Sequence, residues 1–321
     1  MTLTRPFVVL ISVLFFNTGF AKEPILPIAQ SHDLNAEKVA LGRKLFFDKR
    51  LSKNNELSCA SCHQLTRNGA DNKAFSDGVN GQKTTAKTPT VYNAVFNIRQ
   101  TWSGARKDLF DQVDAPITNP REHGTTWPEV VHKLSSDLAL QAQFKKVYQS
   151  PINQQNIQHA IASFEQSLIT TNAPFDLWLK GDPNAINNEA KKGYQLFKDY
   201  GCISCHQGKN VGGNMFSKIG HFGDYFADRG GVINDADLGR FMVTNNPYDK
   251  HVFKVPSLRL STIQTHFFHD GSQDNLDDAI RIMAKYQLGR SIPAQDIQSI
   301  KTFLSSLVGQ HPELTNTYET K

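Results

Sequence analysis

The four cysteines of the chain stand in two similar patterns, each followed directly by a histidine. The patterns are CASCH at residues 59–63 and CISCH at residues 202–206. Disulfide bonds, a thioredoxin-like redox pair and a zinc site are other uses of closely spaced cysteines. The adjacent histidine favours a c-type haem instead, because two thiols form thioethers with the porphyrin and the imidazole reaches the iron. The sequence therefore predicts two c-type haems, one in each half of the chain.

Each predicted haem takes two cysteines and one histidine. The attachment residues are Cys59, Cys62, Cys202 and Cys205, and the proximal iron ligands are His63 and His206. A haem that only carries electrons has both axial faces filled, whereas a haem that binds an oxidant needs one face that is open or able to open. The residue opposite each histidine therefore decides between electron transfer and chemistry.

The second half offers a soft sixth ligand. After residue 21, methionine occurs only at positions 215, 242 and 283. A neutral thioether favours ferrous iron and raises the reduction potential. Met283 ends the amphipathic run LDDAIRIM and is the first candidate, with Met242 the second. The alternative is that Met283 fills a gap in the core.

The amino terminus has the pattern of a secretory signal peptide. Arg5 precedes the apolar run FVVLISVLFF, and the small residues Gly19 and Ala21 suit cleavage after Ala21. An uncleaved membrane anchor is the alternative, but the run is about half of the roughly 20 residues that a membrane span needs. We predict a signal peptide at residues 1–21, a periplasmic protein and no membrane span in the mature chain.

The charge of the chain does not indicate binding to nucleic acid. The formal net charge is +5, and removal of Arg5 with the signal peptide lowers it to +4. The four propionates of two haems would bring the total close to zero. No cluster of lysine and arginine with interleaved aromatic residues is present. We therefore expect no nucleic-acid partner.

A weak internal repeat indicates the elements that hold the haems. The segments GRKLFF (42–47) and GYQLF (193–197) each precede a haem motif. The segments 157–168 and 297–307 each close a half and carry apolar residues 3 and 4 positions apart, which is one face of a helix. The two halves therefore follow one helical plan.

The rest of the chain divides around this plan. Residues 171–190 are rich in Pro, Gly, Asn and Asp and join the halves. Segments 64–128 and 207–256 show little helical periodicity and are too long for idle loops, so we expect functional loops there. The predicted fold is mainly α, with two cytochrome-c-like helical domains, each carrying one covalent c-type haem, and long inserted loops. We place the domains at residues 22–175 and 176–321.

Several segments together resemble the bacterial dihaem cytochrome c peroxidases, including the MauG-type enzymes. They are LSCASCH, KTPTVYNAVFN, TWSGA, GCISCHQG, LGRFMVT, VPSLR, FFHDGS and AIRIMAKYQLGR, and the resemblance runs from about Ala40 to Gly309. It implies a peroxidatic haem in the amino-terminal domain and a high-potential electron-transfer haem in the carboxyl-terminal domain. It also selects Met283 as the sixth ligand of the second haem.

The resemblance implies three residues that act on peroxide or on electron transfer. Glu122 matches the distal glutamate of the family, and a carboxylate there can move a proton between the peroxide oxygens. Gln112 matches a glutamine of the same pocket that could bind the peroxide oxygen. Trp102 matches a tryptophan between the haems. Without the family, a solvated loop glutamate and a core tryptophan would be the ordinary interpretations.

The sequence departs from the family at three positions. Val79 stands where many members have a histidine that caps the peroxidatic iron, so we expect the first haem to be five-coordinate or water-bound at rest. Ala105 stands where an arginine is usual, and Arg106 follows it. Lys87 replaces an asparagine near the calcium site of many members, and its ammonium group could take the cation's place. Calcium is therefore not a firm expectation.

Four further residues were assigned by the resemblance or by their neighbours. Arg240, Arg259 and His269 are expected to meet haem propionates or to line the second haem. Surface ion pairs for the arginines and a core position for the histidine are the alternatives. His123 could transfer protons, but beside Gly124 we expect it on the surface.

These assignments favour a periplasmic enzyme that reduces hydrogen peroxide to water. A small periplasmic cytochrome c or a cupredoxin would supply electrons through the second haem to the first. A MauG-like enzyme that uses peroxide to oxidise residues of a partner protein is the first alternative. A dihaem electron carrier or sensor without catalysis is the second. A homodimer is left open.

Overall fold

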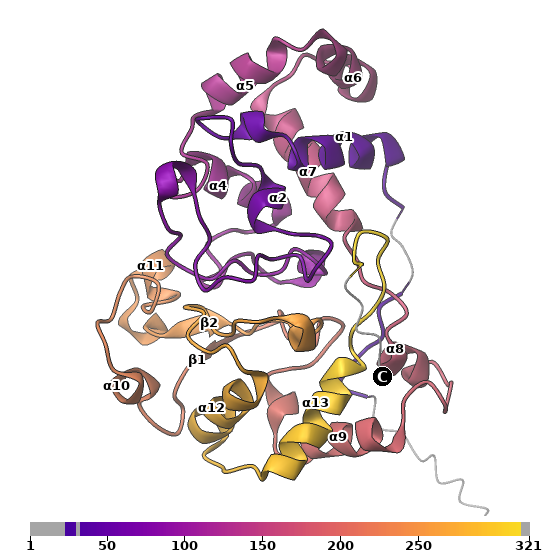
Figure 1. Cartoon of the computed structure of the whole chain (residues 1–321), viewed down its shortest axis with the longest axis vertical. Helices are drawn as coiled ribbons and strands as arrows, with labels where there is room; N and C mark the ends of the chain where they lie inside the picture. The colour runs from indigo at the N-terminus through magenta and orange to yellow at the C-terminus, as the bar shows by residue number, and fades with distance from the viewer. Residues whose placement is uncertain (1–22, 30–32, 316–321) are drawn as a thin grey trace, which may run out of the picture.

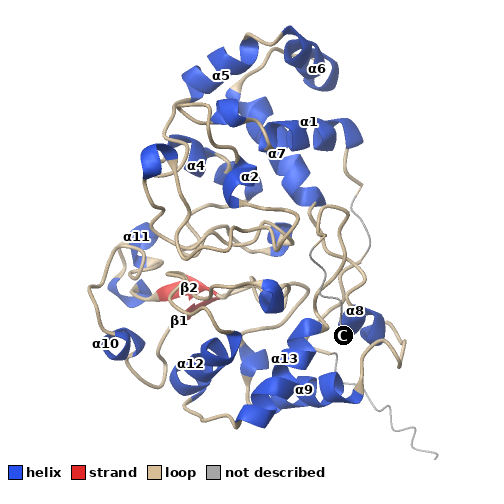
Figure 2. Cartoon of the chain, in the orientation of Figure 1, coloured by secondary structure: helices blue, strands red, loops and turns tan. Residues whose placement is uncertain are grey.

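The computed structural model describes residues 23–29 and 33–315, so the predicted signal peptide lies outside the described residues. The described chain is mainly helical, with one two-stranded sheet (Figures 1 and 2). Its helices are α1 (Ala36–Phe46), α2 (Cys59–Cys62), α3 (Leu109–Gln112), α4 (Asp114–Thr118), α5 (Trp127–Ser135), α6 (Leu138–Tyr148), α7 (Gln154–Ser167), α8 (Pro174–Leu179), α9 (Asn188–Asp199), α10 (Tyr225–Arg229), α11 (Phe241–Thr244), α12 (Leu276–Leu288) and α13 (Ala294–Ser305). The strands are β1 (Phe216–Lys218) and β2 (Val252–Lys254).

Asparagine begins four of the longer helices. The N-cap residues of α1, α7, α9 and α12 are Asn35, Asn153, Asn187 and Asn275. Each side chain accepts a hydrogen bond from a backbone N–H of the first turn, which otherwise has no partner in the helix. A cap of this kind stabilises a helix by about 1 kcal/mol.

The internal repeat predicted from the sequence corresponds to two crossed helix pairs. Helix α1 packs on α7 in the upper body of Figure 1, and α9 packs on α13 in the lower body. A glycine stands at each crossing. A Cβ on Gly42 would lie 1.8 Å from the carbonyl oxygen of Ala160, and one on Gly193 would lie 1.9 Å from that of Ser299. The Gly-x-x-Leu-Phe pattern therefore marks the closest approach of two backbones, and the structure confirms the repeat.

Gly193→Ala should lower the free energy of unfolding by about 1–3 kcal/mol, because the new methyl group meets backbone that cannot turn away. Alanine also gains about 1 kcal/mol of helix propensity over glycine, so the stated loss is the net result. Urea unfolding of the haem-loaded protein measures it. Lys192→Ala, an exposed change on the same helix, is the control. A Gly193→Ala protein as stable as the control would show that the helices can separate without cost.

Two hydrophobic cores follow from the two helix pairs. One contains Phe46, Val130 and Phe164, and the other contains Phe175 and Phe303. The division of the chain into residues 22–175 and 176–321 stays a prediction, because both ends of the described chain cross between the cores. Buried residues of the amino-terminal segment belong to the second core, and those of the carboxyl-terminal tail belong to the first.

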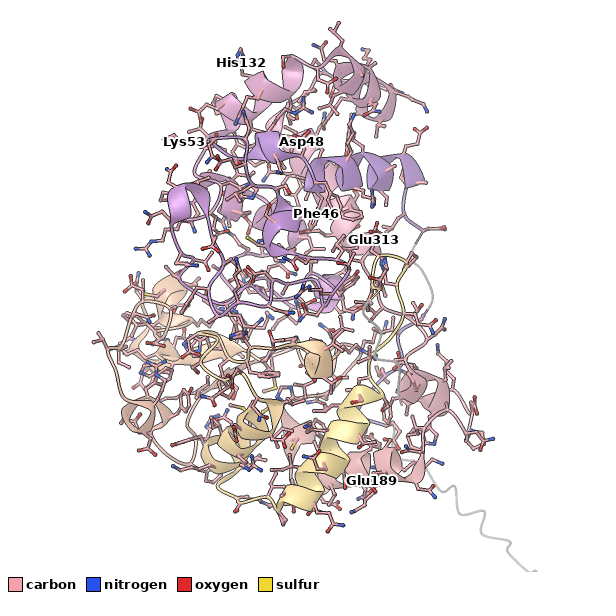
Figure 3. All side chains as sticks on the ribbon, viewed as in Figure 1. Phe46, Asp48, Lys53, His132, Glu189 and Glu313 are labelled. Carbon is pink, nitrogen blue, oxygen red and sulfur yellow. The ribbon has the colours of Figure 1, made fainter. Side chains whose placement is uncertain are left out.

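The crossing ends are held by specific contacts. Ile25 forms a parallel bridge with Gly208 in the lower body. At the other end, Glu313 forms an ion pair with Arg43 of α1 at 2.5 Å. Figure 3 accordingly shows Glu313 near Phe46 in the upper body, while Glu189 lies in the lower body. The two bodies are therefore tied together at both ends of the described chain.

The long segments expected to be functional loops are largely irregular in the structure. Residues 64–128 contain the short helices α3 and α4 and two 3₁₀ turns, and residues 207–256 contain α10, α11 and the two strands. Strands β1 and β2 are antiparallel, with Phe216 opposite Lys254. In Figure 1 these segments lie where the upper and lower bodies meet. Among the described helices, none has the length and apolar character needed to cross a bilayer.

Candidate active site

Helix α2 presents the first haem motif to a cavity of about 50 Å³. Ser58 and Ser61 form a capping box that starts this one-turn helix. Cys59, Cys62 and His63 all line the cavity. The one-turn helix therefore turns both thiols and the imidazole toward the same space, as attachment of one porphyrin requires.

The cysteines do not behave as a disulfide or as a nucleophilic redox pair. All four are free thiols. Burial raises the pKa of Cys62 and of Cys202 to about 11, and it raises that of Cys59 further. A thioredoxin-like pair needs a thiolate, which a lowered pKa provides. The raised values disfavour such a pair, and the histidine next to each motif remains the argument for haem attachment.

The hydrogen bond of His63 prepares its other nitrogen for iron. Its Nδ1 lies 3.1 Å from the carbonyl oxygen of Gly69, so Nδ1 carries the proton and Nε2 is left free as a ligand. Burial lowers the pKa of His63, which keeps the ring neutral. The phenyl ring of Phe46 lies beside the imidazole of His63, with 6.4 Å between the two ring centres.

The distal residues Glu122 and Gln112 reach the same cavity from two other segments. Gln112 ends α3, and Glu122 follows α4 in the loop after Asn119. Asn119 donates its side-chain N–H to Glu122 Oε1 at 2.7 Å. Burial raises the pKa of Glu122, and the Asn119 bond opposes this. The cavity therefore holds a carboxyl group that releases its proton at a higher pH than a surface glutamate does.

The loop that carries Val79 is fastened to the distal loop. The backbone N–H of Val79 donates to the carbonyl oxygen of Glu122 at 2.9 Å. Val79 is buried, and a Cβ on Gly124 would approach its side chain to 2.8 Å. A valine at this position has no atom that can bind iron.

His123 corrects an expectation from the sequence. It was predicted on the surface, but it is 5% exposed and lines the first haem cavity. Its Nδ1 bonds to the carbonyl oxygen of Leu51 at 3.0 Å. Burial lowers its pKa to about 4, so the ring is neutral at neutral pH. The neighbouring Gly124 indicated a turn, and nothing local indicated that the turn folds inward.

Glu165 is a second buried carboxyl group in this cavity, and the sequence analysis missed its role. It lies on α7, is 5% exposed, and its Oε2 has no hydrogen-bond partner among the described residues. Burial raises its pKa to about 8. The available signal was an acid in the middle of the apolar pattern IASFEQSL. Three carboxyl groups therefore line this cavity, those of Glu122, Glu165 and the more exposed Asp77, in place of the one expected.

Glu165→Gln should remove part of the pH dependence of stability. An unfolded glutamate titrates near pH 4.3, whereas the folded one titrates near 8. The folded state therefore binds more protons between these values, and the wild-type free energy of unfolding should fall as the pH rises through them. Urea unfolding at pH 5 and pH 8 should show a smaller fall for Glu165→Gln. Glu56→Gln, an exposed change, should follow the wild type. A fall as large in Glu165→Gln as in the wild type would contradict this role of burial.

The second haem motif lies in a larger cavity of about 480 Å³ with a mainly apolar lining. Cys202, Cys205 and His206 line it, and so does Met283 from α12. Burial lowers the pKa of His206 to about 4. Met242 is 50% exposed on α11 and does not line this cavity. The geometry therefore favours Met283 over Met242 as a partner of His206.

The donor sets of both cavities fit a c-type haem. Each offers two cysteine thiols and one histidine imidazole, and the second cavity adds a thioether. The second cavity also has the volume and apolar lining that a porphyrin needs. In the first cavity the side chains lie closer together, and they must separate when a haem is attached there.

Trp102 lies where the two bodies meet. Its side chain lines the second haem cavity and a separate cavity between the bodies. Its indole Nε1 donates to the carbonyl oxygen of Lys87 at 2.8 Å. Arg106, which follows the position where the family has its arginine, forms ion pairs with Asp111 at 3.3 Å and with Asp114 at 3.2 Å. Its guanidinium is therefore not directed at Trp102.

The propionate contact expected for Arg259 disagrees with the structure. Arg259 is fully buried, and its guanidinium forms two hydrogen bonds with Asp176, at 2.9 and 3.1 Å. Its Nε donates to the carbonyl oxygen of Lys209 at 2.6 Å. These contacts occupy the guanidinium, and Arg259 does not line the second haem cavity. The partner Asp176 lies 83 residues away in the sequence, so no local pattern indicated the pair.

Arg240 and His269 have different positions. Arg240 lies over the ring of Phe216 at 4.1 Å and does not line the second haem cavity. His269 does line this cavity, and its Nε2 bonds to Asp237 at 2.7 Å. The position of His269 agrees with the expected lining of the second haem. The Nη1 of Arg240 is buried and has no hydrogen-bond partner among the described residues, so the propionate contact expected of Arg240 stays a prediction.

One group of side chains could hold a metal ion by distance alone. Ligand atoms of Asp237, His269 and Asp270 lie within 4.8 Å of one another. Arg229 already bonds to both carboxylates, at 2.7 and 2.9 Å. The group is therefore neutralised by a guanidinium, and it gives no support to a calcium site.

Two haem motifs lie in two helical bodies, and Glu122 and Gln112 line the cavity of the first motif. This combination is expected of a dihaem c-type peroxidase. The family model described as di-haem cytochrome c peroxidase matches residues 36–184. The chain belongs to this family, and its cofactors are the two covalently bound c-type haems that the motifs predict. It is an enzyme of the dihaem peroxidase class.

Curated relatives cover most of the chain. The chain is 43% identical to cytochrome c peroxidase Ccp of Escherichia coli K12 over 89% of its own length and 61% of that protein, so it spans less than two thirds of that relative. It is 40% identical to cytochrome c551 peroxidase of Nitrosomonas europaea over 91% of its length and 86% of that protein. The methylamine utilization protein MauG of Methylophilus methylotrophus is 30% identical, over 88% and 82%.

Solved structures share the fold at lower identity. A MauG-like protein associated with microbial copper homeostasis matches with a TM-score of 0.76 at 24% identity, over 94% of this chain and 99% of that chain. The diheme peroxidase BthA of Burkholderia thailandensis E264 matches with a TM-score of 0.71 at 17% identity, over 88% of each chain. These similarities support the fold, that is, the arrangement of the helices, and they do not bear on the roles of individual residues.

Proposed function

We propose that the protein reduces hydrogen peroxide to water at the amino-terminal cavity, with electrons that enter at the carboxyl-terminal one. The observation that carries the proposal is that Glu122, Gln112 and His63 face one cavity from three separate segments. A distal acid and an amide opposite a histidine ligand are what peroxide cleavage needs. An electron carrier would not need them.

The protein's part in the reaction is to bind peroxide and move its proton. The bound haems supply the iron and store the electrons. The Gln112 amide can donate a hydrogen bond to a peroxide oxygen. The Glu122 carboxylate can accept a proton from the inner oxygen and return it to the outer one, which leaves as water. Asn119 holds Glu122 through its Oε1 and leaves the other oxygen for this work.

The carboxyl-terminal cavity supports the electron-transfer part of the proposal. His206 and Met283 face it together, and a histidine and methionine pair raises the reduction potential of a c-type haem. Trp102 lines this cavity and the space between the bodies. We infer that its indole lies on the route between the two halves.

Steady-state kinetics test the proposal. The as-isolated ferric protein, given a reduced small cytochrome c or a reduced cupredoxin, should consume peroxide without a prior reduction step. We expect this because Val79 provides no iron ligand that must first leave. No turnover by the dihaem protein with either donor would contradict the proposed function.

Met283→Leu should lower the reduction potential of the second haem, because it removes the thioether that stabilises ferrous iron. The sulfur-to-iron charge-transfer band should also disappear. Spectroelectrochemistry and absorption spectra measure both. Met242→Leu on the exposed face of α11 is the matched control and should change neither. An unchanged potential and band in Met283→Leu would leave the second haem without its proposed ligand.

A MauG-like oxidation of a partner protein is the second candidate. The observation that favours it is Val79, which leaves the first iron without the capping histidine of many peroxidases. Met283 weighs against it, because the MauG type is expected to use a tyrosine there. The identity to the cytochrome c peroxidases of Escherichia coli and Nitrosomonas europaea, 43% and 40%, exceeds the 30% to MauG of Methylophilus methylotrophus and also favours the peroxidase. Fast turnover that depends on a reduced cytochrome separates the two.

The setting of the reaction is also part of the proposal. The predicted signal peptide at residues 1–21 supports a periplasmic location, where c-type haems and small donor proteins would meet the enzyme. We keep two haem domains, divided near residue 175, and a homodimer as proposals. Size-exclusion chromatography with light scattering would measure the oligomeric state.

A further inference from the structure

A cavity of about 100 Å³ lies between the two bodies, and residues of both halves line it. Asn97, Gln100 and Trp102 line it from the first half, and Asn210 and Ser257 from the second. A volume of this size holds about three waters or one carboxylate group.

Two lysines face this cavity, one from each half. Lys87 is 4% exposed and Lys254 is 7% exposed. Lys87 Nζ donates to the carbonyl oxygen of Thr88 at 3.1 Å. Within the described residues no carboxylate forms an ion pair with either lysine, and Asp71 acts on Lys87 only over a longer distance. Burial lowers the pKa of each lysine to about 8.

The backbone holds both lysines in place. The N–H of Lys254, on β2, donates to the carbonyl oxygen of Trp102 at 2.8 Å. The Trp102 indole donates to the carbonyl oxygen of Lys87, also at 2.8 Å. The N–H of Lys87 donates to the carbonyl oxygen of His269 at 2.8 Å. The lysines are therefore fixed at this junction, and a buried ammonium without an acidic partner carries a large desolvation cost.

A third polar group points to an anionic occupant. Ser261 lines the cavity between the bodies, and its Oγ is buried without a hydrogen-bond partner. Ser261 and Lys254 also line the second haem cavity. Ser261 and Lys254 therefore stand where the two cavities adjoin. Lys87, whose ammonium group uses one N–H on Thr88, faces the cavity between the bodies, and all three groups can donate.

We propose that Lys87, Lys254 and Ser261 form an oxyanion site between the two halves that receives a propionate carboxylate of the haem attached at Cys202 and Cys205. This inference rests on the attached haems and not on peroxide turnover. It replaces the propionate contact expected for Arg259, whose guanidinium is held by Asp176. The same two ammonium groups would repel a divalent cation, so the junction needs no calcium.

The reduction potential of the second haem tests the site. Lys254→Met keeps the length of the side chain and removes the charge beside the carboxylate. The ferric state then gains relative stability, and the reduction equilibrium should shift by tenfold or more, which is about 59 mV for one electron. Lys218→Met on the paired strand β1 removes an exposed charge and should shift it far less. Equal shifts in the two variants would overturn the proposal.

Two further variants keep the test open if Lys254→Met does not accumulate as dihaem protein. Ser261→Ala should shift the potential in the same direction by a smaller amount, because it removes one donor. Lys254→Arg should keep the wild-type potential more closely than Lys254→Met. A wild-type potential in Ser261→Ala, together with a large shift in Lys254→Arg, would overturn the site.

If a free anion or a cation occupied this site instead of a propionate, the reduction potential of the wild type would respond to added phosphate or to chelation. If the occupant were inorganic phosphate, the wild-type potential would change with phosphate concentration at constant ionic strength, and this result would overturn the propionate assignment. If calcium were bound, chelation with EDTA would change the potential of the wild type, and this would also overturn it. We expect neither treatment to have an effect.

Discussion

Replacing Glu122 with glutamine should slow peroxide reduction by about 10²–10⁴-fold, the usual range for loss of a general acid–base group. Both haems should remain attached, because Glu122 touches neither motif through a hydrogen bond; its Oε1 accepts from Asn119. Glutamine has nearly the same shape and can hold the same loop. The loss should therefore lie in kcat and kcat/KM and not in haem content.

The pH profile gives this prediction a second readout. Glu122 must be ionised to accept a proton, and burial raises its pKa. The acidic limb of kcat/KM should therefore lie above the ordinary value of about 4.3, with activity rising as the pH rises through it. Glu122→Gln should lose this limb. Glu56→Gln, an exposed change, should keep the wild-type rate and profile. A Glu122→Gln enzyme that turns over like this control would remove Glu122 from the mechanism.

Replacing Arg259 with methionine should lower the free energy of unfolding by about 3–5 kcal/mol. The change leaves Asp176 buried and without its cation, since both side chains are fully buried. Asp176 would keep its bond from the backbone N–H of Ile28, at 3.1 Å, which cannot replace a guanidinium. The pair fastens the amino-terminal segment to the second body, so its loss should also loosen that segment.

A double-mutant cycle separates the pair from the rest of the core. Adding Asp176→Asn to Arg259→Met removes the stranded charge and should restore part of the stability. Arg281→Met is the control, because Arg281 and Asp278 form an exposed pair on α12 whose loss should cost less than about 1 kcal/mol. Urea unfolding of the haem-loaded wild type, the two single variants, the double variant and the control measures the cycle. An Arg259→Met protein within about 1 kcal/mol of the wild type would mean that water reaches Asp176.

The features that the sequence predicted well depend only on residues that are close together in the chain. The haem motifs need only five consecutive residues. The repeated helices need only an apolar face and a glycine, and the crossings at Gly42 and Gly193 show why that glycine is there. Met283 was favoured over Met242 from an amphipathic pattern, and the second haem cavity includes only the first of the two.

The features that the sequence missed depend on contacts between distant segments. Arg259 was expected at a propionate, but its partner Asp176 comes from α8, 83 residues away in the sequence. His123 was expected on the surface, but the backbone of Leu51 covers it. Glu165 resembles any acid on an amphipathic helix until α7 is packed on α3. A lysine such as Lys254 is usually exposed, so its burial was not predictable from its neighbours.

Electron paramagnetic resonance of the as-isolated ferric protein, with resonance Raman on the same sample, tests the central claim that one iron is open and the other closed. We expect one high-spin, five-coordinate or water-bound haem and one low-spin haem with histidine and methionine ligands. Two low-spin haems, with a protein side chain bound to the amino-terminal iron of the as-isolated protein, would contradict the account. His123 lines that cavity and could be such a side chain, and a change of that signal in His123→Ala would identify it.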